Sequence, residues 1–372
     1  MPTEHPRDRA RSEPAGPAAP EARARITLAD VAARAGVSRA TASLVARDSD
    51  LVADRTRRAV LDAMNELGYV YHRGAASLRK RRSGAIAVVV ADLINPFQAE
   101  LAMGFEAELR PSGEITLLSR TFDDLDRQAM LLTTMLEYQI DGVLLVPATG
   151  TRDEDLSVLA SRGIPYVLVN RYIGMPGANY VGMREDAAGR TAAAHLLEHG
   201  CATLAYFGGL AVATARRDRF EGFRAAVAGS AARVDESWCA PTPNTAVGSH
   251  EVAARLLAEG GELPDGVLCH SDAVAFGLMR ALRETGRSAP RDMRIVGGAD
   301  VEVAAMWEPP LTSISVRAED MGRAAATLLR RVIAGEAPDG PYLFEPDLVV
   351  RESCGCHSGH REHLDGAAAQ EL

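Results

Sequence analysis

The feature that most constrains the fold is a long alternation of short apolar runs and helix-like segments, which starts at residue 84. The run 85–90 (AIAVVV) is apolar throughout and is followed by a predicted helix at 96–109; the same order recurs from 142–146 onward. Continuous apolar strands separated by helices predict parallel sheets that are covered on both faces. Because about 270 residues exceed the usual core of one sheet, we predict two doubly wound α/β lobes with a cleft between them.

The segment 27–47 has the pattern of two short helices joined by a tight turn. Thr27 and Asp30 form a helix-start signal, and Gly36 supplies a left-handed stop. Ser38 is suited to cap the second helix. That helix carries basic and hydroxyl side chains on its outer side, namely Arg39, Thr41, Ser43 and Arg47. This arrangement is typical of a DNA-binding helix-turn-helix, although an ordinary antiparallel helix pair would share much of it.

A third amphipathic helix is predicted at residues 54–67, with Gly68 as its stop. Its apolar face comprises Val60, Leu61, Met64 and Leu67. These side chains can close a small three-helix core over the first two helices. We therefore predict an all-α head at residues 26–70.

Residues 71–82 are predicted to form a hinge between this head and the rest of the chain. They contain Arg73, small residues at Ala75 and Ala76, and an apolar side chain at Leu78. A small face allows helices to approach closely, and an apolar wedge beside cationic residues suits insertion into the DNA minor groove. A flexible basic linker is the alternative interpretation.

Charge is distributed unevenly along the chain. Residues 26–82 carry 11 Lys and Arg against 6 Asp and Glu, a net of +5, whereas residues 83–372 carry 25 against 40, a net of −15. A basic head on an acidic body predicts that a polyanion binds at one end only.

Residues 1–25 have the composition of a disordered arm and lack the apolar core of a secretory signal. No apolar run approaches the roughly 20 residues that span a bilayer, so we expect a cytoplasmic protein without a membrane partner.

Motifs of common enzyme classes are absent from the sequence. We find no P-loop, no Gly-x-Gly-x-x-Gly after the first strand, no Gly-x-Ser-x-Gly elbow and no zinc-protease motif. His195 and His199 lie four residues apart but have no Glu at the metalloprotease spacing, so we interpret them as part of a helix face. We therefore predict neither catalysis nor a cofactor. A solute-binding transport protein would share the two-lobed body, but it would need a secretory signal and would have no use for a basic head.

The cysteines do not form an evident metal site. Five are present, and only Cys354-Gly-Cys356, followed by His357 and His360, looks like a cluster. This cluster lacks a second Cys pair at ligand spacing. We therefore expect a solvated tail here, with no metal, and disorder over residues 357–372.

The head and the hinge together resemble the DNA-binding part of the lactose/galactose repressor (LacI-type) family. The pattern T-x-x-D-V-A-x-x-A-G-V-S-x-x-T-x-S runs from Thr27 to Ser43. The later R-x-x-V-x-x-A-x-x-x-L-G-Y runs from Arg57 to Tyr69, and the hinge motif A-x-x-L starts at Ala75. So many matches in register indicate a sequence-specific regulator of transcription.

The resemblance implies which side chains contact DNA. Arg39 and Ala40 occupy the principal base-reading pair, and Leu44 a third base-facing position. Arg39 can chelate a guanine, whereas Ala40 and Leu44 offer only apolar contact, so we expect an operator that differs from the family's common one. The residues implied in base, phosphate or minor-groove contact are Thr27, Ser38, Arg39, Ala40, Thr41, Ser43, Leu44, Arg47, Tyr69, Arg73, Ala75 and Leu78.

We assign residues 83–356 to a two-lobed effector-binding and dimerisation domain. From residue 83 to about residue 353 it resembles the effector domain of the same family, which is similar to periplasmic binding proteins. The resemblance implies an effector pocket formed by Phe97, Arg171, Arg217, Ser271 and Asp272. Arg217 would bond ligand hydroxyls or a carboxylate, and Phe97 would supply an apolar or stacking face. The alternatives are that Arg217 is a solvated helix residue and that Asp272 caps the helix that follows it.

In such domains the chain crosses between the lobes three times. In this chain we expect the crossings near Asn170, Ala299 and Ala334. Ala299 also marks a departure from the family, because the family's loop places an aspartate there that often bonds sugar hydroxyls. A simple hexose is therefore less well supported than the fold suggests.

Together these patterns predict a homodimeric repressor that binds a pseudo-palindromic operator in double-stranded DNA. A small-molecule effector, a sugar or a related metabolite, would bind in the cleft between the lobes and change the affinity for DNA. The alternative is a DNA-binding regulator whose pocket is vestigial or binds a protein partner.

Overall fold

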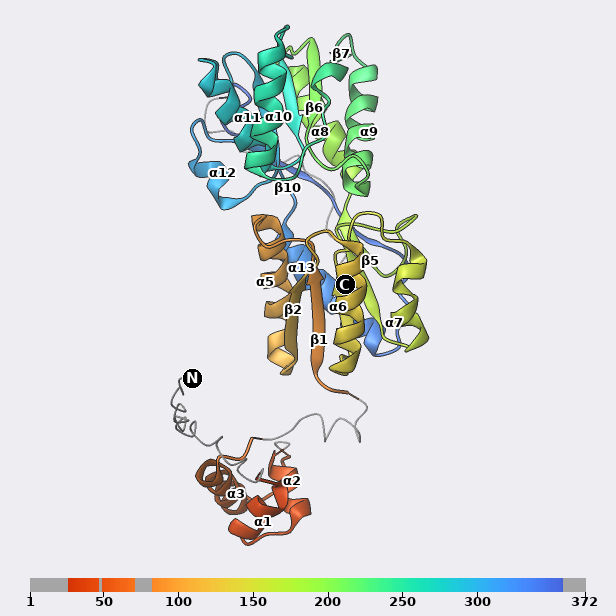
Figure 1. The fold of residues 1–372 in the computed structure, drawn as a ribbon, viewed down its shortest axis with the longest axis vertical. Helices are drawn as coiled ribbons and strands as arrows, with labels where there is room; N and C mark the ends of the chain where they lie inside the picture. Colours follow the sequence, from red (N-terminus) through yellow and green to blue (C-terminus); the bar gives the residue numbers. More distant parts are fainter. Residues whose placement is uncertain (1–25, 47–48, 71–81, 357–372) are drawn as a thin grey trace, which may run out of the picture. The chain divides into compact units, whose positions relative to one another are not determined.

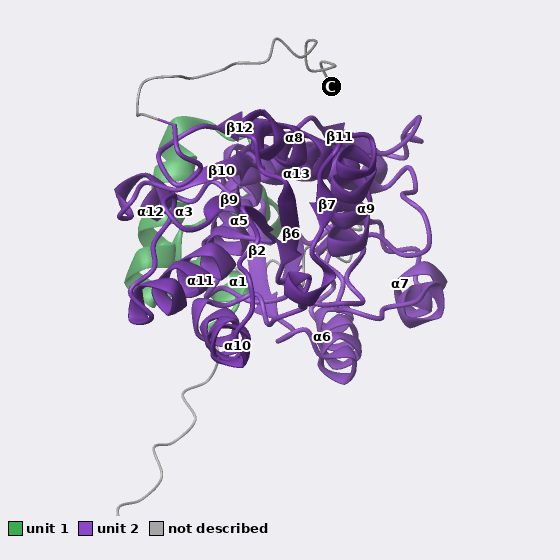
Figure 2. Ribbon diagram, turned by 90° about the horizontal axis from the view of Figure 1, so that it is seen from above, with its two compact units in different colours: residues 1–76 green, residues 77–372 purple. Residues whose placement is uncertain are grey.

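The structure, a computed structural model, describes residues 26–46, 49–70 and 82–356. The predicted arm, the tail, and all of the predicted hinge except its last residue lie outside the described residues. So do four of the predicted site residues: Arg47, Arg73, Ala75 and Leu78. The chain separates into two units, Met1–Ala76 and Ser77–Leu372 (Figure 2).

Local interactions set the ends of the three helices of the head, α1 (Leu28–Arg34), α2 (Arg39–Ala46) and α3 (Asp54–Leu67). Thr27 and Asp30 form the predicted capping box: the Thr27 amide donates to the Asp30 carboxylate at 2.8 Å. The turn after α1 has Gly36 at φ 67°, and α3 ends at Gly68 with φ 64°. The predicted helix starts and stops of the head are confirmed, because they depend on residues close together in the chain.

The core of the head is small and apolar. It consists of Val31, Ala32, Ala42, Val45, Val52, Val60 and Ala63. The prediction for α3 was wrong at Leu61, which is exposed. Positions i, i+3, i+4 and i+7 share one helix face, so Ala63 lies on the same face as Val60 while Leu61 is turned about 100° away.

The first lobe is built on a parallel sheet in the order β11-β5-β4-β3-β1-β2, of which β1, β2 and β5 are labelled in Figure 1. Its strands are β1 (Ala85–Val90), β2 (Ile115–Arg120), β3 (Gly142–Leu145), β4 (Tyr166–Val169), β5 (Tyr180–Met183) and β11 (Tyr342–Phe344). The helices of this lobe are α5 (Pro96–Leu109), α6 (Leu125–Glu137), α7 (Ser157–Ser161) and α13 (Ala318–Ile333), with short 3₁₀ turns η1 (Arg110–Ser112) and η2 (Asp153–Leu156). β1 is buried along its whole length, as expected for a central strand of a sheet covered on both faces.

The second lobe has a sheet in the order β12-β10-β9-β8-β6-β7, in which only the β10–β12 pair is antiparallel among the described pairings. Its strands are β6 (Thr203–Phe207), β7 (Arg233–Val234), β8 (Gly266–Cys269), β9 (Arg294–Ala299), β10 (Thr312–Ser315) and β12 (Asp347–Val349). The helices are α8 (Glu185–Glu198), α9 (Thr214–Ala228), α10 (Ala246–Glu259), α11 (Asp272–Glu284) and α12 (Glu302–Met306), with the 3₁₀ turn η3 (Glu236–Trp238). The prediction of two doubly wound α/β lobes is confirmed.

The predicted crossing points between the lobes were wrong. The chain leaves the first sheet after β5 rather than near Asn170, and it returns after β10 rather than near Ala299. The third crossing joins β11 to β12 rather than lying near Ala334. Both β5 (YVGM) and β10 (TSIS) are four residues long and contain small or polar side chains, so neither stands out as an apolar run.

Helices α8 and α9 approach each other closely through glycine. A Cβ atom added to Gly189 would lie 1.9 Å from the carbonyl oxygen of Arg219, and one added to Gly222 would lie 2.0 Å from that of Asp186. The two helix backbones therefore leave no space for a side chain at either position.

Among the described residues, no helix is both long and apolar enough to cross a membrane.

This close approach predicts that Gly222→Ala destabilises the second lobe by about 1–3 kcal/mol, because the helices must move apart. The measurement is the free energy of unfolding in denaturant. Gly177→Ala is the control, since a Cβ at this exposed glycine would meet nothing within 4 Å. Equal stability of the two variants would contradict the backbone packing described for α8 and α9.

Candidate functional site

The first turn of α2 is open to solvent in the head. Ser38, Arg39 and Ala40 are exposed. The Ser38 hydroxyl accepts a hydrogen bond from the Thr41 amide at 3.1 Å and lies 2.9 Å from the Thr41 hydroxyl. This cap fixes the start of α2 and leaves the Arg39 side chain free to reach outward.

The other predicted DNA contacts of the head differ in exposure. Thr27 is exposed, whereas Thr41 and Ser43 are half-buried. Leu44 and Tyr69 are also half-buried and pack against the core of the head. Leu44 thus contributes to the core, and only part of its side chain can face a ligand.

All five predicted effector residues follow the carboxyl ends of parallel strands. Phe97 opens α5 after β1, and Arg171 follows β4. In the second lobe Arg217 lies in the first turn of α9 after β6, and Ser271 and Asp272 begin α11 after β8. The carboxyl ends of parallel strands form the ligand-binding edge of such sheets.

Left-handed backbone conformations concentrate at the same edges. Phe122 (φ 58°) and Asp123 (φ 60°) follow β2, and Asn170 (φ 63°) follows β4. Ala299 (φ 140°) and Asp300 (φ 55°) lie at the end of β9. Residues other than glycine rarely adopt positive φ, and such strain tends to occur at ligand sites.

An ion pair holds Arg171 at the edge of the first lobe. Its Nη1 atom donates to Asp123 Oδ1 at 2.5 Å and to the Pro147 carbonyl at 3.1 Å. Thr149 donates to the same carboxylate through its amide and its hydroxyl. Burial raises the pKa of Asp123, but Arg171 and Thr149 outweigh burial and lower it overall. The carboxylate therefore stays ionised.

Three side chains link the two lobes. Tyr172, which follows β4, donates its hydroxyl hydrogen to Asp218 Oδ2 at 2.5 Å. Arg217 Nη2 donates to the same hydroxyl oxygen at 2.5 Å, and Arg217 Nε donates to Asp218 Oδ1 at 3.0 Å. Burial and the neighbouring Asp218 raise the pKa of Tyr172 to about 12, so the phenol remains a donor. The lobes are thus joined by neutral and charged hydrogen bonds.

A buried ion pair lies beneath this link. Arg219 and Glu185 are 5% and 6% exposed, with Arg219 Nη2 and Nε at 2.6 and 2.7 Å from Glu185 Oε2. Arg219 Nη1 also donates to the carbonyl of His270 at 2.7 Å. Burial and the cations Arg219, Arg216 and Arg171 hold the pKa of His270 well below its usual range, so the imidazole is neutral. His270 was not predicted as a site residue, because a single histidine after a strand gives no pattern to detect.

Ser271 and Asp272 have structural partners of their own. The Ser271 hydroxyl accepts from the Val274 amide at 3.3 Å and donates to Asn244. Asp272, only 1% exposed, accepts from the Ser313 hydroxyl at 2.6 Å and from the Val301 amide at 2.8 Å. Ser271 therefore caps α11, while Asp272 ties α11 to the loop after β9 and to β10.

Comparison with known proteins decides the family. Residues 27–71 match the model of bacterial regulatory proteins of the lacI family, and residues 193–354 match a periplasmic binding protein-like domain. The regulator CelR of Thermobifida fusca is 35% identical over 342 residues, covering 90% of this chain and 99% of CelR. The regulator DegA of Bacillus subtilis is 30% identical, covering 88% of this chain and 98% of DegA.

The chain belongs to the lacI family.

It is a helix-turn-helix regulator of transcription. A solved CelR–cellobiose complex matches this lacI-family regulator with a TM-score of 0.65 and 33% identity, covering 88% of this chain and all of that chain. The lac repressor dimer bound to operator and an anti-inducer matches with a TM-score of 0.79 over 88% of this chain and 99% of that chain; at 24% identity it supports the fold alone. The family resemblance and the fold class predicted from the sequence are confirmed. The named relatives are regulators rather than enzymes.

The predicted pocket residues are distinct from one clear cavity in the regulator. This cavity has a volume of about 350 Å³ and lies between α10 and α11, beside the loop after α12. Its lining includes Val247, His250, Phe276, Arg280 and Trp307. None of the predicted effector residues lines it.

Two expectations about metal ligands were wrong. Cys354 is fully buried rather than part of a solvated tail, and His195 and His199 are not a lone pair on a helix face. The ligand atoms of these three residues and Cys356 all lie within 4.8 Å of one another. Burial opposes ionisation of Cys354, but the neighbouring His195 and Thr312 lower its pKa to about 7. Each half of the cluster was visible in the sequence, but only the fold brings the halves together.

The contacts of Asp272 predict a structural role that can be measured. Asp272→Ala leaves buried donors at Val301 and Ser313 without an acceptor, so it should destabilise the regulator by about 2–4 kcal/mol. Asp126→Ala, which removes an exposed carboxylate from the first turn of α6, is the matched control. A small effect at both positions would contradict the structural role.

The same side chain predicts a pH dependence. Burial raises the pKa of Asp272 to about 6, above the roughly 3.9 of an unfolded aspartate. The folded state therefore binds this proton more tightly, and the stability that Asp272 contributes is full below about pH 4 and declines as pH rises toward about 6. The free energy of unfolding, measured across this pH range, should decline in the wild type. In Asp272→Ala the contribution of Asp272 to this decline should be missing.

Proposed function

We propose that this regulator represses transcription by binding a pseudo-palindromic operator as a homodimer, and that a small-molecule effector between its lobes changes the affinity for DNA. The observation that carries the effector part is the polar link between the lobes, in which Arg217 bonds both Tyr172 and Asp218. We propose that the protein acts in the cytoplasm and, like its named relatives, is a regulator and not an enzyme.

For the head, we propose that α2 enters the major groove. Its exposed first turn presents Arg39 and Ala40, and residues 26–82 around it carry 11 Lys and Arg against 6 Asp and Glu, a net of +5. A bidentate arginine contact to guanine would supply most of the polar base recognition, with apolar contact from Ala40 and part of Leu44. Ser38, Thr41 and Ser43 would bind phosphates and fix the register. We further propose that Arg73, Ala75 and Leu78 contact the DNA minor groove.

For the body, we propose an effector with several hydroxyl groups, of the carbohydrate class. Arg217 engages Nε and Nη2 with protein acceptors, and its guanidinium carries further N–H donors for ligand oxygens. Arg171 and the ionised Asp123 offer a donor and an acceptor from the other lobe. Phe97 would supply an apolar face and Ser271 a hydroxyl. The solved structure of CelR is a complex with cellobiose, which supports this ligand class.

Two residues modify the family expectation for this pocket. Ala299 offers no carboxylate, so the acceptors for ligand hydroxyls must come from other side chains, with Asp123 as our candidate. Asp272 has its carboxylate engaged by Ser313 and Val301, so we propose that it shapes the pocket by holding the loop after β9. Both points favour a ligand that differs from a simple hexose.

Coupling to DNA would act through the link between the lobes. A ligand that replaces or strengthens the Tyr172–Asp218 bond changes the equilibrium between lobe arrangements. It shifts DNA affinity only to the extent that it binds those arrangements with different affinity. Induction and co-repression are the two outcomes of the experiment below.

For the dimer, we propose that the surface around the cavity between α10 and α11 contacts a second copy of the chain. Val247 and Met306 are exposed there beside the stacked rings of Phe276 and Trp307. Exposed apolar clusters of this kind mark protein interfaces. A dimer also suits a pseudo-palindromic site, because two heads would read two half-sites.

Arg39→Ala should weaken binding to the selected operator by roughly 5–150-fold per contacted half-site, the value of one bidentate base contact of about 1–3 kcal/mol. The operator is first obtained by selection from random DNA, which we expect to return a site that differs from the family's common one. Arg58→Ala, an exposed arginine of α3, removes the same charge and should have a smaller effect that is similar on all DNA sequences. Return of the common family site would contradict the proposed role of Ala40 and Leu44.

Arg217→Ala should abolish the response to effector while leaving operator binding in its absence intact. Effectors are found by thermal shift with a metabolite library, in which a ligand at 100 times its Kd adds about 2.7 kcal/mol of stability. Operator titrations with and without the hit then measure the response. Arg224→Ala is the control, because Arg224 is on the same helix and equally exposed, at 50%, but pairs with Glu236. Silence across the library would favour a vestigial or protein-binding pocket.

A further inference from the structure

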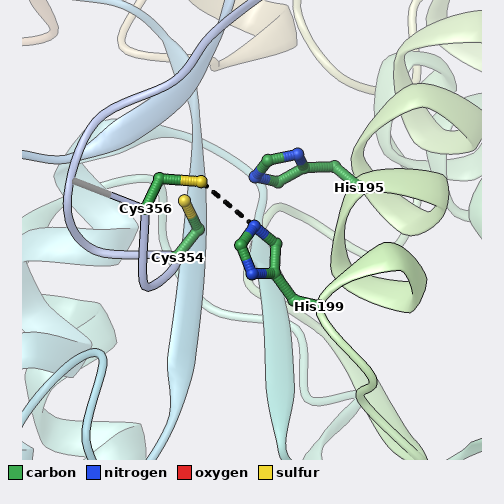
Figure 3. A group of neighbouring side chains, drawn as sticks. All are labelled: His195, His199, Cys354 and Cys356. Carbon is green, nitrogen blue, oxygen red and sulfur yellow. Dashed lines mark hydrogen bonds between the residues drawn. The ribbon is translucent and has the colours of Figure 1, made fainter. Parts of the chain in front are cut away.

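Two short motifs from distant parts of the chain meet at one end of the second lobe. His195 and His199, four residues apart, share a face at the end of α8. Cys354 and Cys356 flank Gly355, whose φ of 96° lets the chain turn so that the two sulfur atoms lie close together. Figure 3 shows the four side chains pointing toward one another, and all four ligand atoms lie within 4.8 Å of each other.

The cluster contains a buried polar atom without a protein partner. His195 is 7% exposed, and within the described part of the chain its Nε2 atom has no hydrogen-bond partner. Buried ring nitrogens normally have one, because an unmatched buried polar group costs about 1–3 kcal/mol. On the other side of the cluster, Cys356 Sγ lies 3.1 Å from His199 Nε2. The cluster thus contains one close contact between a thiol and an imidazole, and one buried imidazole nitrogen without a hydrogen-bond partner among the described residues.

The cysteine side of the cluster is rigidly held. The Ser353 hydroxyl donates to the Ile295 carbonyl at 2.7 Å and accepts from the Thr312 amide at 2.9 Å. The Thr312 hydroxyl lies 3.0 Å from Cys354 Sγ. The Ile295 amide donates to the Ser353 carbonyl at 2.9 Å. Since β9 and β10 fix this segment and α8 fixes the histidines, the four side chains are positioned before any ligand arrives.

We propose that His195, His199, Cys354 and Cys356 form a binding site for one Zn²⁺ ion per chain. Two thiolates and two neutral imidazoles are a four-ligand set that Zn²⁺ prefers, and their charges balance the dication. Zn–S and Zn–N distances of about 2.3 and 2.0–2.1 Å place tetrahedral ligand atoms roughly 3.3–3.8 Å apart. The ligand atoms of the cluster, all within 4.8 Å of one another, lie close to these separations. Binding releases the two thiol protons to solvent.

The position of the site indicates what the metal does. It fastens the end of α8 to the segment that follows β12, and both belong to the second lobe. The first residue of the same helix, Glu185, forms the buried pair with Arg219. Zn²⁺ therefore acts as a structural clamp on the helix that leads from the lobe crossing. This role is independent of the proposed effector and operator.

The test uses the full-length protein, freed of metal under reducing conditions and titrated with Zn²⁺ against a chromophoric chelator. We expect one Zn²⁺ per chain and a higher melting temperature in its presence. Co²⁺ should give the visible bands of a tetrahedral thiolate complex. Cys356→Ser and His199→Ala, both at half-buried positions, should each lower the affinity by more than the roughly 100-fold that losing an outer-shell partner costs. His195→Ala should do the same.

The control is Cys239→Ser, which removes a half-buried thiol of the same lobe outside the cluster and should leave Zn²⁺ affinity unchanged. Zn²⁺ should also protect the half-buried Cys356, but not Cys239, from alkylation mapped by mass spectrometry. Absence of stoichiometric binding overturns the proposal. So does binding that survives Cys356→Ser, or that is lost in His357→Ala or His360→Ala but kept in His195→Ala. A Cys354–Cys356 disulfide that persists under mild reduction also overturns it.

Discussion

The second lobe depends on the buried pair between Glu185 and Arg219. Both side chains are almost inaccessible to water, and removing one partner of such a pair typically costs about 3–5 kcal/mol because the other charge is left buried and unmatched. Glu185 begins α8 directly after the chain crosses from the first sheet, and Arg219 lies on α9. By also donating to the carbonyl of His270, Arg219 joins the start of two helices to the end of β8. This contact thus joins α9, which carries Arg217, to the residues after β8, where Ser271 and Asp272 lie.

Helix packing makes that contact possible. Gly189 and Gly222 let α8 and α9 approach until backbone meets backbone, which brings the Arg219 guanidinium onto the Glu185 carboxylate. Around this fixed centre the groups at the cleft edge are held less tightly, with Arg217 half exposed and shared between Tyr172 and Asp218. A rigid buried pair beneath an adaptable polar link suits a site that must hold its ligand groups in place and still allow the lobes to move. The Cys and His cluster lies at the opposite end of α8, so the proposed metal would fix the same helix at its other end.

Interactions between residues near in sequence account for what could be predicted. The capping box of Thr27 and Asp30 and the stops at Gly36 and Gly68 span a few residues each, and the buried strands and amphipathic helices follow their own periodicity. The short strands β5 and β10 escaped prediction because their length and composition carry no periodic signal, and the lobe crossings were misplaced as a result. The apolar face of α3 was misassigned at Leu61 for a related reason, since one residue changes a helix face by about 100°.

The sequence by itself determined the family, the helix-turn-helix head and the two-lobed α/β body, because these follow from local chemistry and from motifs in register. Only the tertiary structure decided which polar side chains from distant parts of the chain contact one another. Arg171 meets Asp123 across 48 residues, Arg219 meets Glu185 across 34, and Cys356 meets His199 across 157. No spacing in the chain encodes such contacts, since they form where strands and helices from separate segments end at the same place. The physical reason is that secondary structure depends on neighbours along the chain, whereas a site depends on neighbours in space.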